Sequence, residues 1–100
     1  MDPLERLLFW LLDGTRGGPT RIALLSILSK RPMNLRQLSI AAGIDYKTAE
    51  HHVQLLIKNS VLGCIGSGYG KAYFVTDEAK GQRRFIELAK GGNNGGKKKD

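Results

Sequence analysis

Residues 34–58 read NLRQLSIAAGIDYKTAEHHVQLLIK and contain the signals for two helices joined by a tight turn. Asn34, followed three positions later by Gln37, is the pattern of a capping box, in which each side chain accepts a hydrogen bond from the other residue's backbone N–H. This pattern predicts a helix from Leu35 to Ala42. Gly43 ends that helix, because glycine readily adopts the left-handed conformation that follows many helices.

The second helix of this stretch is predicted from Tyr46 to about Lys58. Asp45 stands immediately before it and is a favoured N-cap, because its carboxylate accepts hydrogen bonds from the free N–H groups of the first turn. A helix of about two turns, a glycine-containing turn and a longer helix together predict a helix-turn-helix.

The residue pattern changes after this second helix. Residues 61–66, VLGCIG, and residues 71–76, KAYFVT, predict two short strands. Residues 67–70, SGYG, lie between them and supply the glycines that a tight hairpin requires. A helix-turn-helix followed at once by a two-stranded hairpin predicts a winged helix, which is an α+β fold with mostly α content.

Further helices are predicted on both sides of this motif. They run from Pro3 to Asp13, from about Pro19 to Lys30, and from Asp77 to about Lys90. The second of them is apolar around most of its circumference, so we expect it at the centre of the core. The predicted organisation is a dimerisation helix (1–13), a winged helix domain with a C-terminal helix (14–90) and a disordered basic tail (91–100).

The first helix has two apolar faces. Leu4, Leu8 and their neighbours at helical spacing form one stripe, and Phe9 and Trp10 lie on the other side. One face can pack on the chain's own domain, and the second is most simply covered by a second subunit. The predicted dimer contacts, which include one residue of the last helix, are Leu4, Leu8, Phe9, Trp10 and Phe85.

The composition indicates one small domain. The chain has 100 residues, of which 41% are hydrophobic and 25% are charged, which is typical of a globular protein. The longest apolar run, residues 7–12, is far shorter than the roughly 20 residues that span a bilayer. Neither a membrane protein nor a secretory signal is therefore predicted. The single cysteine cannot form an internal disulfide, which suits a reducing cytoplasm.

The charge of the chain is strongly positive. There are 16 Lys and Arg residues against nine Asp and Glu, a formal net charge of +7. Residues 14–76 contain eight of the basic residues and only two acidic ones, so the expected folded domain carries about +6 by itself. Such a balance favours a polyanion as the partner.

The helix at 46–58 is predicted to present the residues that bind this polyanion. If Ala49, Val53 and Leu56 face the core, the helical period leaves a polar face opposite them, whose donors suit DNA base edges and phosphates. The hairpin suits a minor-groove or phosphate contact. A plain solvated face and a flexible hairpin are the simpler interpretations. The predicted DNA contacts are Arg36, Tyr46, Lys47, Thr48, His51, Gln54, Lys58, Tyr69 and Lys71.

Neither a metal site nor a catalytic site is predicted. His51 and His52 are adjacent on a helix and therefore point about 100° apart, which suits one ion poorly. We expect His52 to be partly buried and hydrogen-bonded, and Cys64 to be a small core residue. No Ser-His-Asp or Cys-His arrangement is suggested by spacing. We therefore expect a binding protein without a cofactor rather than an enzyme.

With these elements placed, the chain resembles archaeal winged helix-turn-helix DNA-binding proteins and is similar to the ArsR and MarR-like regulators. The resemblance covers about residues 18–81. It implies that the helix from Tyr46 reads the major groove, that the hairpin is the wing, and that the terminal helices form a two-fold dimer. The metal-sensing members have a cysteine pair that this chain lacks, so a constitutive or protein-controlled regulator is expected. The matching segments are residues 20–22, 34–38, 42–48, 51–53 with Leu56, 73–76 and Gly81.

Three functions remain open at this point. The leading one is a homodimeric, sequence-specific transcriptional regulator that binds double-stranded DNA in the cytoplasm. The second is a winged helix used for protein–protein assembly in transcription or repair machinery, with other transcription proteins as partners. The third is a non-specific chromosomal DNA-binding protein. RNA binding is less favoured, because a hairpin offers no aromatic stacking platform.

Overall fold

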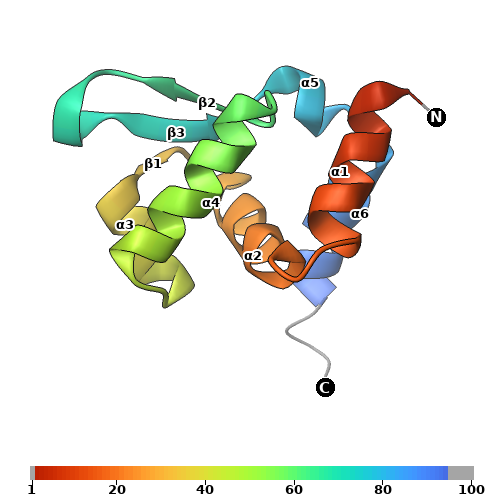
Figure 1. The fold of residues 1–100 in the computed structure, drawn as a ribbon, viewed down its shortest axis with the longest axis horizontal. Coiled ribbons are helices and arrows are strands. Elements are labelled where there is room, and N and C mark those ends of the chain that lie inside the picture. Colours follow the sequence, from red (N-terminus) through yellow and green to blue (C-terminus); the bar gives the residue numbers. More distant parts are fainter. Residues whose placement is uncertain (1, 95–100) are drawn as a thin grey trace.

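The computed structural model describes residues 2–94, with side chains through Ala89. It has a group of helices with one small sheet at one side (Figure 1). The predicted tail from residue 95 onward lies outside the described residues. In chain order the elements are α1 (Pro3–Asp13), α2 (Gly18–Leu28), β1 (Met33–Asn34), α3 (Leu35–Ala42), α4 (Tyr46–Lys58), β2 (Leu62–Ile65), the 3-10 turn η1 (Gly68–Gly70), β3 (Ala72–Val75), α5 (Asp77–Lys80) and α6 (Arg83–Asn94).

The predicted helix-turn-helix is confirmed with its bounds. The backbone N–H of Asn34 donates to Gln37 Oε1 at 3.0 Å, and the N–H of Gln37 donates to Asn34 Oδ1 at 2.8 Å, which completes the capping box of α3. Gly43 ends α3 with φ 70°. Asp45 Oδ1 then accepts from the N–H of Thr48 at 2.6 Å and starts α4. Local capping therefore determines how the two helices begin and end.

The sheet has three antiparallel strands in the order β1-β3-β2. The hairpin of β2 and β3 was predicted, with each strand two residues longer than observed, one at each end. The short β1 was not predicted; it places Met33 opposite Tyr73 and Asn34 opposite Ala72. This third strand joins the start of α3 to the first half of β3 in the wing. The wing is the hairpin segment from β2 to β3. Figure 1 shows the wing extending away from the helices.

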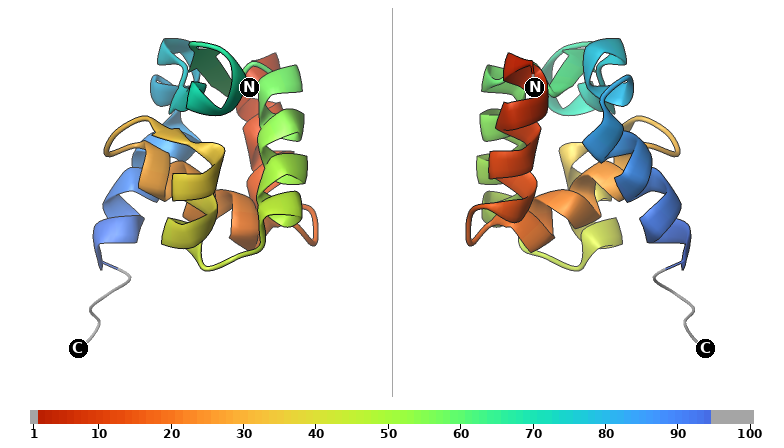
Figure 2. Two further views of the ribbon diagram at one scale, coloured as in Figure 1. Left: turned by 90° about the vertical axis from the view of Figure 1, so that its left-hand side faces the viewer. Right: turned by 90° about the vertical axis from the view of Figure 1, so that its right-hand side faces the viewer.

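The C-terminal region differs from the single helix predicted at residues 77–90. Thr76 Oγ1 accepts from the N–H of Ala79 at 3.2 Å and caps α5, as expected, but α5 ends at Lys80. A separate helix, α6, continues to Asn94, so the first four residues of the predicted tail at 91–100 are helical. The chain changes direction between α5 and α6 and brings α6 beside α1 and α2 (Figures 1 and 2).

A single hydrophobic core joins the terminal helices to the winged helix. α1 packs against α2 and α6, and its residues Leu8, Leu11 and Leu12 are almost fully buried. Leu8 and Phe85, both predicted at a dimer interface, are instead part of this core, with 0% and 5% of their surface exposed. The apolar side of α1 packs against α6 within the same chain, so neither Leu8 nor Phe85 is available to a partner. None of the described helices is long and apolar enough to cross a membrane.

Candidate nucleic-acid interface

The orientation of α4 is determined by the side chains that it buries. Ala49, Val53 and Leu56 have no exposed surface and hold one side of the helix on the core. The opposite side is exposed, as the helical period predicted. The exposed polar residues of this face are Lys47, His51, Gln54 and Lys58, and Thr48 is exposed beside the buried stripe.

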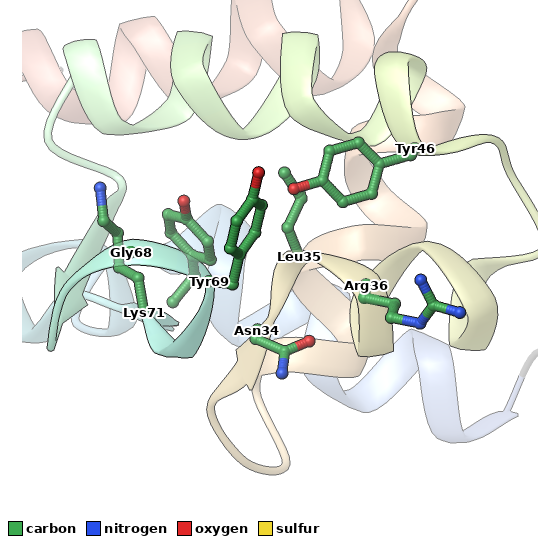
Figure 3. Close-up of a pocket in the computed structure, with 8 residues that line it drawn as sticks. Asn34, Leu35, Arg36, Tyr46, Gly68, Tyr69 and Lys71 are labelled. Carbon is green, nitrogen blue, oxygen red and sulfur yellow. The ribbon is translucent and has the colours of Figure 1, made fainter.

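The first turn of α4 lies across a pocket from the wing. The pocket has a volume of about 510 Å³, and its lining comes from the start of α3, the start of α4, and the wing with β3 (Figure 3). Figure 3 shows Tyr46 on one side of this space and Gly68, Tyr69 and Lys71 on the other. The lining residues are Asn34, Leu35, Arg36, Tyr46, Gly68, Tyr69, Lys71 and Tyr73.

Four of the nine residues predicted to bind DNA line this pocket, namely Arg36, Tyr46, Tyr69 and Lys71. The other five form the exposed face of α4. We call these nine residues together the α4–wing surface. The structure thus brings residues from three separate elements to one region of the molecule.

Tyr73 also lines the pocket and was missed in the sequence. Only 6% of its surface is exposed, and it lies on β3, the central strand of the sheet. Burial, followed by the nearby Cys64, Tyr46 and Glu50, raises the pKa of Tyr73 above its ordinary value. The sequence did not indicate that Tyr73 lies on a central strand, because β1, which pairs Met33 with Tyr73, was not predicted. By contrast, Tyr69 at the tip of the wing is 93% exposed.

The cations of the α4–wing surface are not neutralised by carboxylates. Among the residues whose side chains are described, the ion pair found joins Arg84 to Asp13, and both lie on the terminal helices. Arg36, Lys47 and Lys58 are all exposed. Unpaired cations at a surface produce a positive potential that attracts polyanions.

The two histidines have different environments, and the expectation for His52 is confirmed. His51 is exposed, whereas His52 is buried and lies 3.1 Å from Arg21 through its Nδ1 atom. Within residues 2–94, no group of three His, Cys, Asp or Glu residues could hold a metal ion. The expectation that Cys64 is a core residue is wrong: its side chain is exposed, because β2 runs out of the core toward the wing tip.

A second exposed region lies on α1, at the end of the molecule opposite the wing (Figure 1). Phe9 and Trp10 expose 54% and 57% of their surface, and Leu4 is half-buried. Next to Phe9, a shallow pocket of about 230 Å³ is formed with charged residues, which are Glu5, Arg83, Arg84 and Glu87. We call Leu4, Phe9 and Trp10 the α1 surface.

The fold is similar to those of several solved structures. One is the homodimeric winged helix-turn-helix DNA-binding domain of a possible ArsR-family transcriptional regulator from Mycobacterium bovis, at 13% identity and a TM-score of 0.67, covering 96% of this chain and 85% of that one. A second is a MarR family transcriptional regulator from Silicibacter pomeroyi, at 18% identity and a TM-score of 0.67, covering 93% of this chain and 63% of that one.

A third similar structure is Sso10a-2, a DNA-binding protein from Sulfolobus solfataricus, at 22% identity and a TM-score of 0.55, covering 77% of this chain and 83% of that one. The sequence matches no protein-family model and no curated protein. At these identities the likeness shows the fold alone, and the chain has the winged helix fold that the sequence predicted.

Proposed function

We propose that the protein is a homodimeric transcriptional regulator that binds double-stranded DNA in a sequence-specific manner. In this proposal α4 enters the major groove and the wing contacts the adjacent backbone or minor groove. The observation that carries it is the α4–wing surface, where exposed donors and cations from α3, α4 and the wing lie together without carboxylate partners.

The dimensions and chemistry of α4 support the groove assignment. A helix of about 10–12 Å diameter fits a major groove about 12 Å wide. Lys47, His51 and Gln54 are exposed on one face and carry donors for base edges or phosphates. A glutamine side chain can pair with adenine through two hydrogen bonds. Thr48 lies in the first turn of α4, where its exposed side-chain hydroxyl can donate to a phosphate.

The pocket beside α4 supports a backbone contact. On a duplex, the strand that separates the major groove from the minor groove passes between a helix in one groove and a hairpin in the other. In this protein Arg36 and Lys71 line the space between α4 and the wing. Two cations at that position suit the phosphates of this strand.

The α1 surface supports the dimer. Phe9 and Trp10 are large aromatic side chains that are more than half exposed, which is the composition of the centre of many protein interfaces. The similar Mycobacterium bovis domain is homodimeric. Two copies joined through α1 would leave both α4–wing surfaces free, because α1 and the wing lie on opposite sides of the molecule (Figure 1).

Two other functions remain as alternatives. A non-specific chromosomal DNA-binding protein would use the same cations, and the similar Sulfolobus solfataricus structure is a DNA-binding protein. An assembly module would use the wing or α1 against another transcription protein. In every case we infer a binding protein, not an enzyme. Archaeal origin and a cytoplasmic location stay predictions of the sequence.

Selection from a random pool of duplexes separates these alternatives. The full chain is used to retain duplexes over several rounds, and the retained pool is sequenced. We expect enrichment of a motif with two related half-sites about one helical turn apart, because a two-fold dimer presents two recognition helices. Retention without enrichment would point to non-specific binding, and no retention at low salt would contradict DNA binding altogether. The variant with Lys47, His51 and Lys71 all changed to alanine is the matched control and should retain far less DNA.

A further inference from the structure

A buried arginine connects the N-terminal helix to α4. Only 4% of the surface of Arg21, on α2, is exposed. Its Nε donates to the carbonyl oxygen of Leu11, near the end of α1, at 3.0 Å. Its Nη2 donates to Thr15 Oγ1, and the Thr15 hydroxyl donates in turn to the same Leu11 carbonyl at 3.3 Å. One guanidinium therefore ties α2 to α1 and to the turn after it.

The remaining arm of this guanidinium reaches α4. Arg21 Nη1 lies 3.1 Å from Nδ1 of His52. An arginine only donates hydrogen bonds, so Nδ1 must accept and the imidazole must be neutral, with its proton on Nε2. Among the described side chains, Arg21 has no carboxylate partner. The charge is instead solvated by a carbonyl, a hydroxyl and an imidazole.

The turn between α1 and α2 is closed over this cluster. A Cβ atom added to Gly17 would lie 2.6 Å from Arg21 Nη1 and 2.9 Å from His52 Cε1. A Cβ atom essentially never lies this close to another heavy atom, so only glycine fits at this position without displacing the guanidinium or the imidazole. The backbone of the turn, the arginine and the histidine are therefore packed as one unit.

The groups around His52 oppose its protonation. Burial, then the charge of Arg21 on α2, then His51 on α4 itself lower the pKa of His52 below the ordinary value of 6.5. The α1–α2 turn contributes Thr15 and Gly17, which do not titrate, and no charged group of α3 or β2 acts on the ring among the described residues. A protonated ring would turn Nδ1 into a donor facing the guanidinium, with two like charges 3.1 Å apart.

We infer that Arg21 is a positioning residue for DNA recognition, which holds α4 against the end of α1 as long as His52 is uncharged. The inference rests on the proposed function. α1 carries Phe9 and Trp10 of the proposed dimer, and the opposite side of α4 from the core carries Lys47 and Gln54. The contacts of Arg21 thus determine the position of α4 relative to the dimer axis. This position matters because two recognition helices bind one duplex only when they are correctly spaced.

Histidine variants test the hydrogen bond to Nδ1. In His52→Asn, the side-chain oxygen occupies nearly the place of Nδ1 and accepts from Arg21 at every pH. In His52→Leu, that acceptor is lost with little change in volume. At pH 7.5 we expect His52→Asn to bind the selected duplex as the wild type does, and His52→Leu to bind about fivefold or more weakly. Circular dichroism at the assay temperature ensures that only folded protein is compared.

The pH profile separates positioning from a merely structural role. The ratio of the wild-type dissociation constant to that of His52→Asn is measured from pH 7.5 to pH 5, so that every pH effect common to the two proteins cancels. We expect this ratio to rise as the pH falls, because only the wild type loses the acceptor. A flat ratio, or a folded His52→Leu that binds as well as the wild type, would overturn the inference.

A measurement without DNA keeps the inference distinct from the proposed function. In the free wild-type protein, NMR should show the amides of residues 11–15 and of α4 shifting with the same midpoint as the His52 ring. In Arg21→Met the amides of residues 11–15 should no longer follow the ring. If no duplex binds the wild type, the proposed function fails. If the amides of residues 11–15 and the His52 ring shift with different midpoints, the coupling itself is overturned. If Arg21→Met does not fold, the comparison is made with Thr15→Val, which removes the Nη2 acceptor together with the hydroxyl that donates to the Leu11 carbonyl.

Discussion

Arg84 of α6 forms two parallel hydrogen bonds with the carboxylate of Asp13 at the end of α1. Nε donates to Oδ2 at 2.7 Å and Nη2 donates to Oδ1 at 2.8 Å. The two side chains expose 20% and 32% of their surface, so the pair is partly screened by water. A bidentate pair in such a position stabilises the fold by about 1 kcal/mol or less. It nevertheless connects residues 71 positions apart and helps to hold the terminal helices together.

This pair makes part of the stability depend on pH. The hydrogen bonds from Arg84 are the main cause that lowers the pKa of Asp13 below its usual value of 3.8. A carboxylate with a lowered pKa stabilises the fold above the unfolded-state pKa, and the contribution is lost as the pH falls through the folded-state pKa. We expect Asp13→Asn to be less stable than the wild type by up to about 1 kcal/mol at pH 7. Urea unfolding at pH 7 and below pH 3 measures this difference, which should shrink in acid; an equal difference at both pH values would contradict the assignment.

The parts of the fold that local signals determine were predictable from the sequence. Asn34 with Gln37, Gly43 and Asp45 fixed the ends of α3 and α4, because capping depends on residues three or four positions apart. The exposed face of α4 followed from the helical period. The strand β1 was missed because a two-residue strand has no periodicity, and its partner Tyr73 is far away in the chain.

The parts that depend on long-range packing were not predictable. Arg21 counted only as one of the basic residues of the domain, and nothing in its neighbours in sequence indicated burial beside His52. Phe85 was predicted at the dimer interface because the sequence did not show the break between α5 and α6. This break brings α6 against α1 and buries Phe85 in the core. Cys64 has an apolar neighbourhood in sequence, but the wing leaves the core at that residue. The pocket is formed by residues of α3, α4 and the wing, and the sequence of each of these elements alone does not indicate it.

Lys47 should contribute to DNA binding without contributing to stability. Its side chain is exposed in the first turn of α4 and has no ion-pair partner among the described residues. We expect Lys47→Ala to weaken binding by about 1–3 kcal/mol if it contacts a base, or to lower the salt slope by about one if it contacts a phosphate. The melting temperature should stay the same. Lys80→Ala, an exposed lysine on α5, is the matched control, and an equal loss of DNA binding in both variants would contradict a specific role.

Trp10 should hold two copies together. It is 57% exposed on α1, and a charge placed at the centre of an apolar interface would remain unpaired when buried. We expect Trp10→Glu to sediment as a monomer at a concentration where the wild type is a dimer. Ile40→Glu places the same charge at another exposed apolar residue, on α3, and should leave the dimer intact. A Trp10→Glu variant that remains a dimer would remove α1 from the interface.

Gly18 should be intolerant of any side chain. It is buried at the start of α2, where an added Cβ would collide with the carbonyl oxygen of Leu12 and lie 2.9 Å from its carbonyl carbon. Backbone atoms cannot move aside as a flexible side chain can, so we expect Gly18→Ala to cost about 1–3 kcal/mol of unfolding free energy. Gly70→Ala is the control, since nothing lies within 4 Å of its added Cβ. Equal urea midpoints for the two variants would show that the α1–α2 turn adjusts more easily than its packing indicates.

The most direct test of the central claim is the affinity of the full chain for duplex DNA at two salt concentrations. Fluorescence anisotropy is recorded with a random duplex and with the duplex that selection enriches. The account predicts tighter binding to the selected duplex, an affinity that falls steeply with salt through counterion release, and a shallower slope for the variant with Lys47, His51 and Lys71 changed to alanine. Absence of binding to both duplexes at low salt, or wild-type binding by the triple variant, would contradict the assignment of the α4–wing surface to DNA.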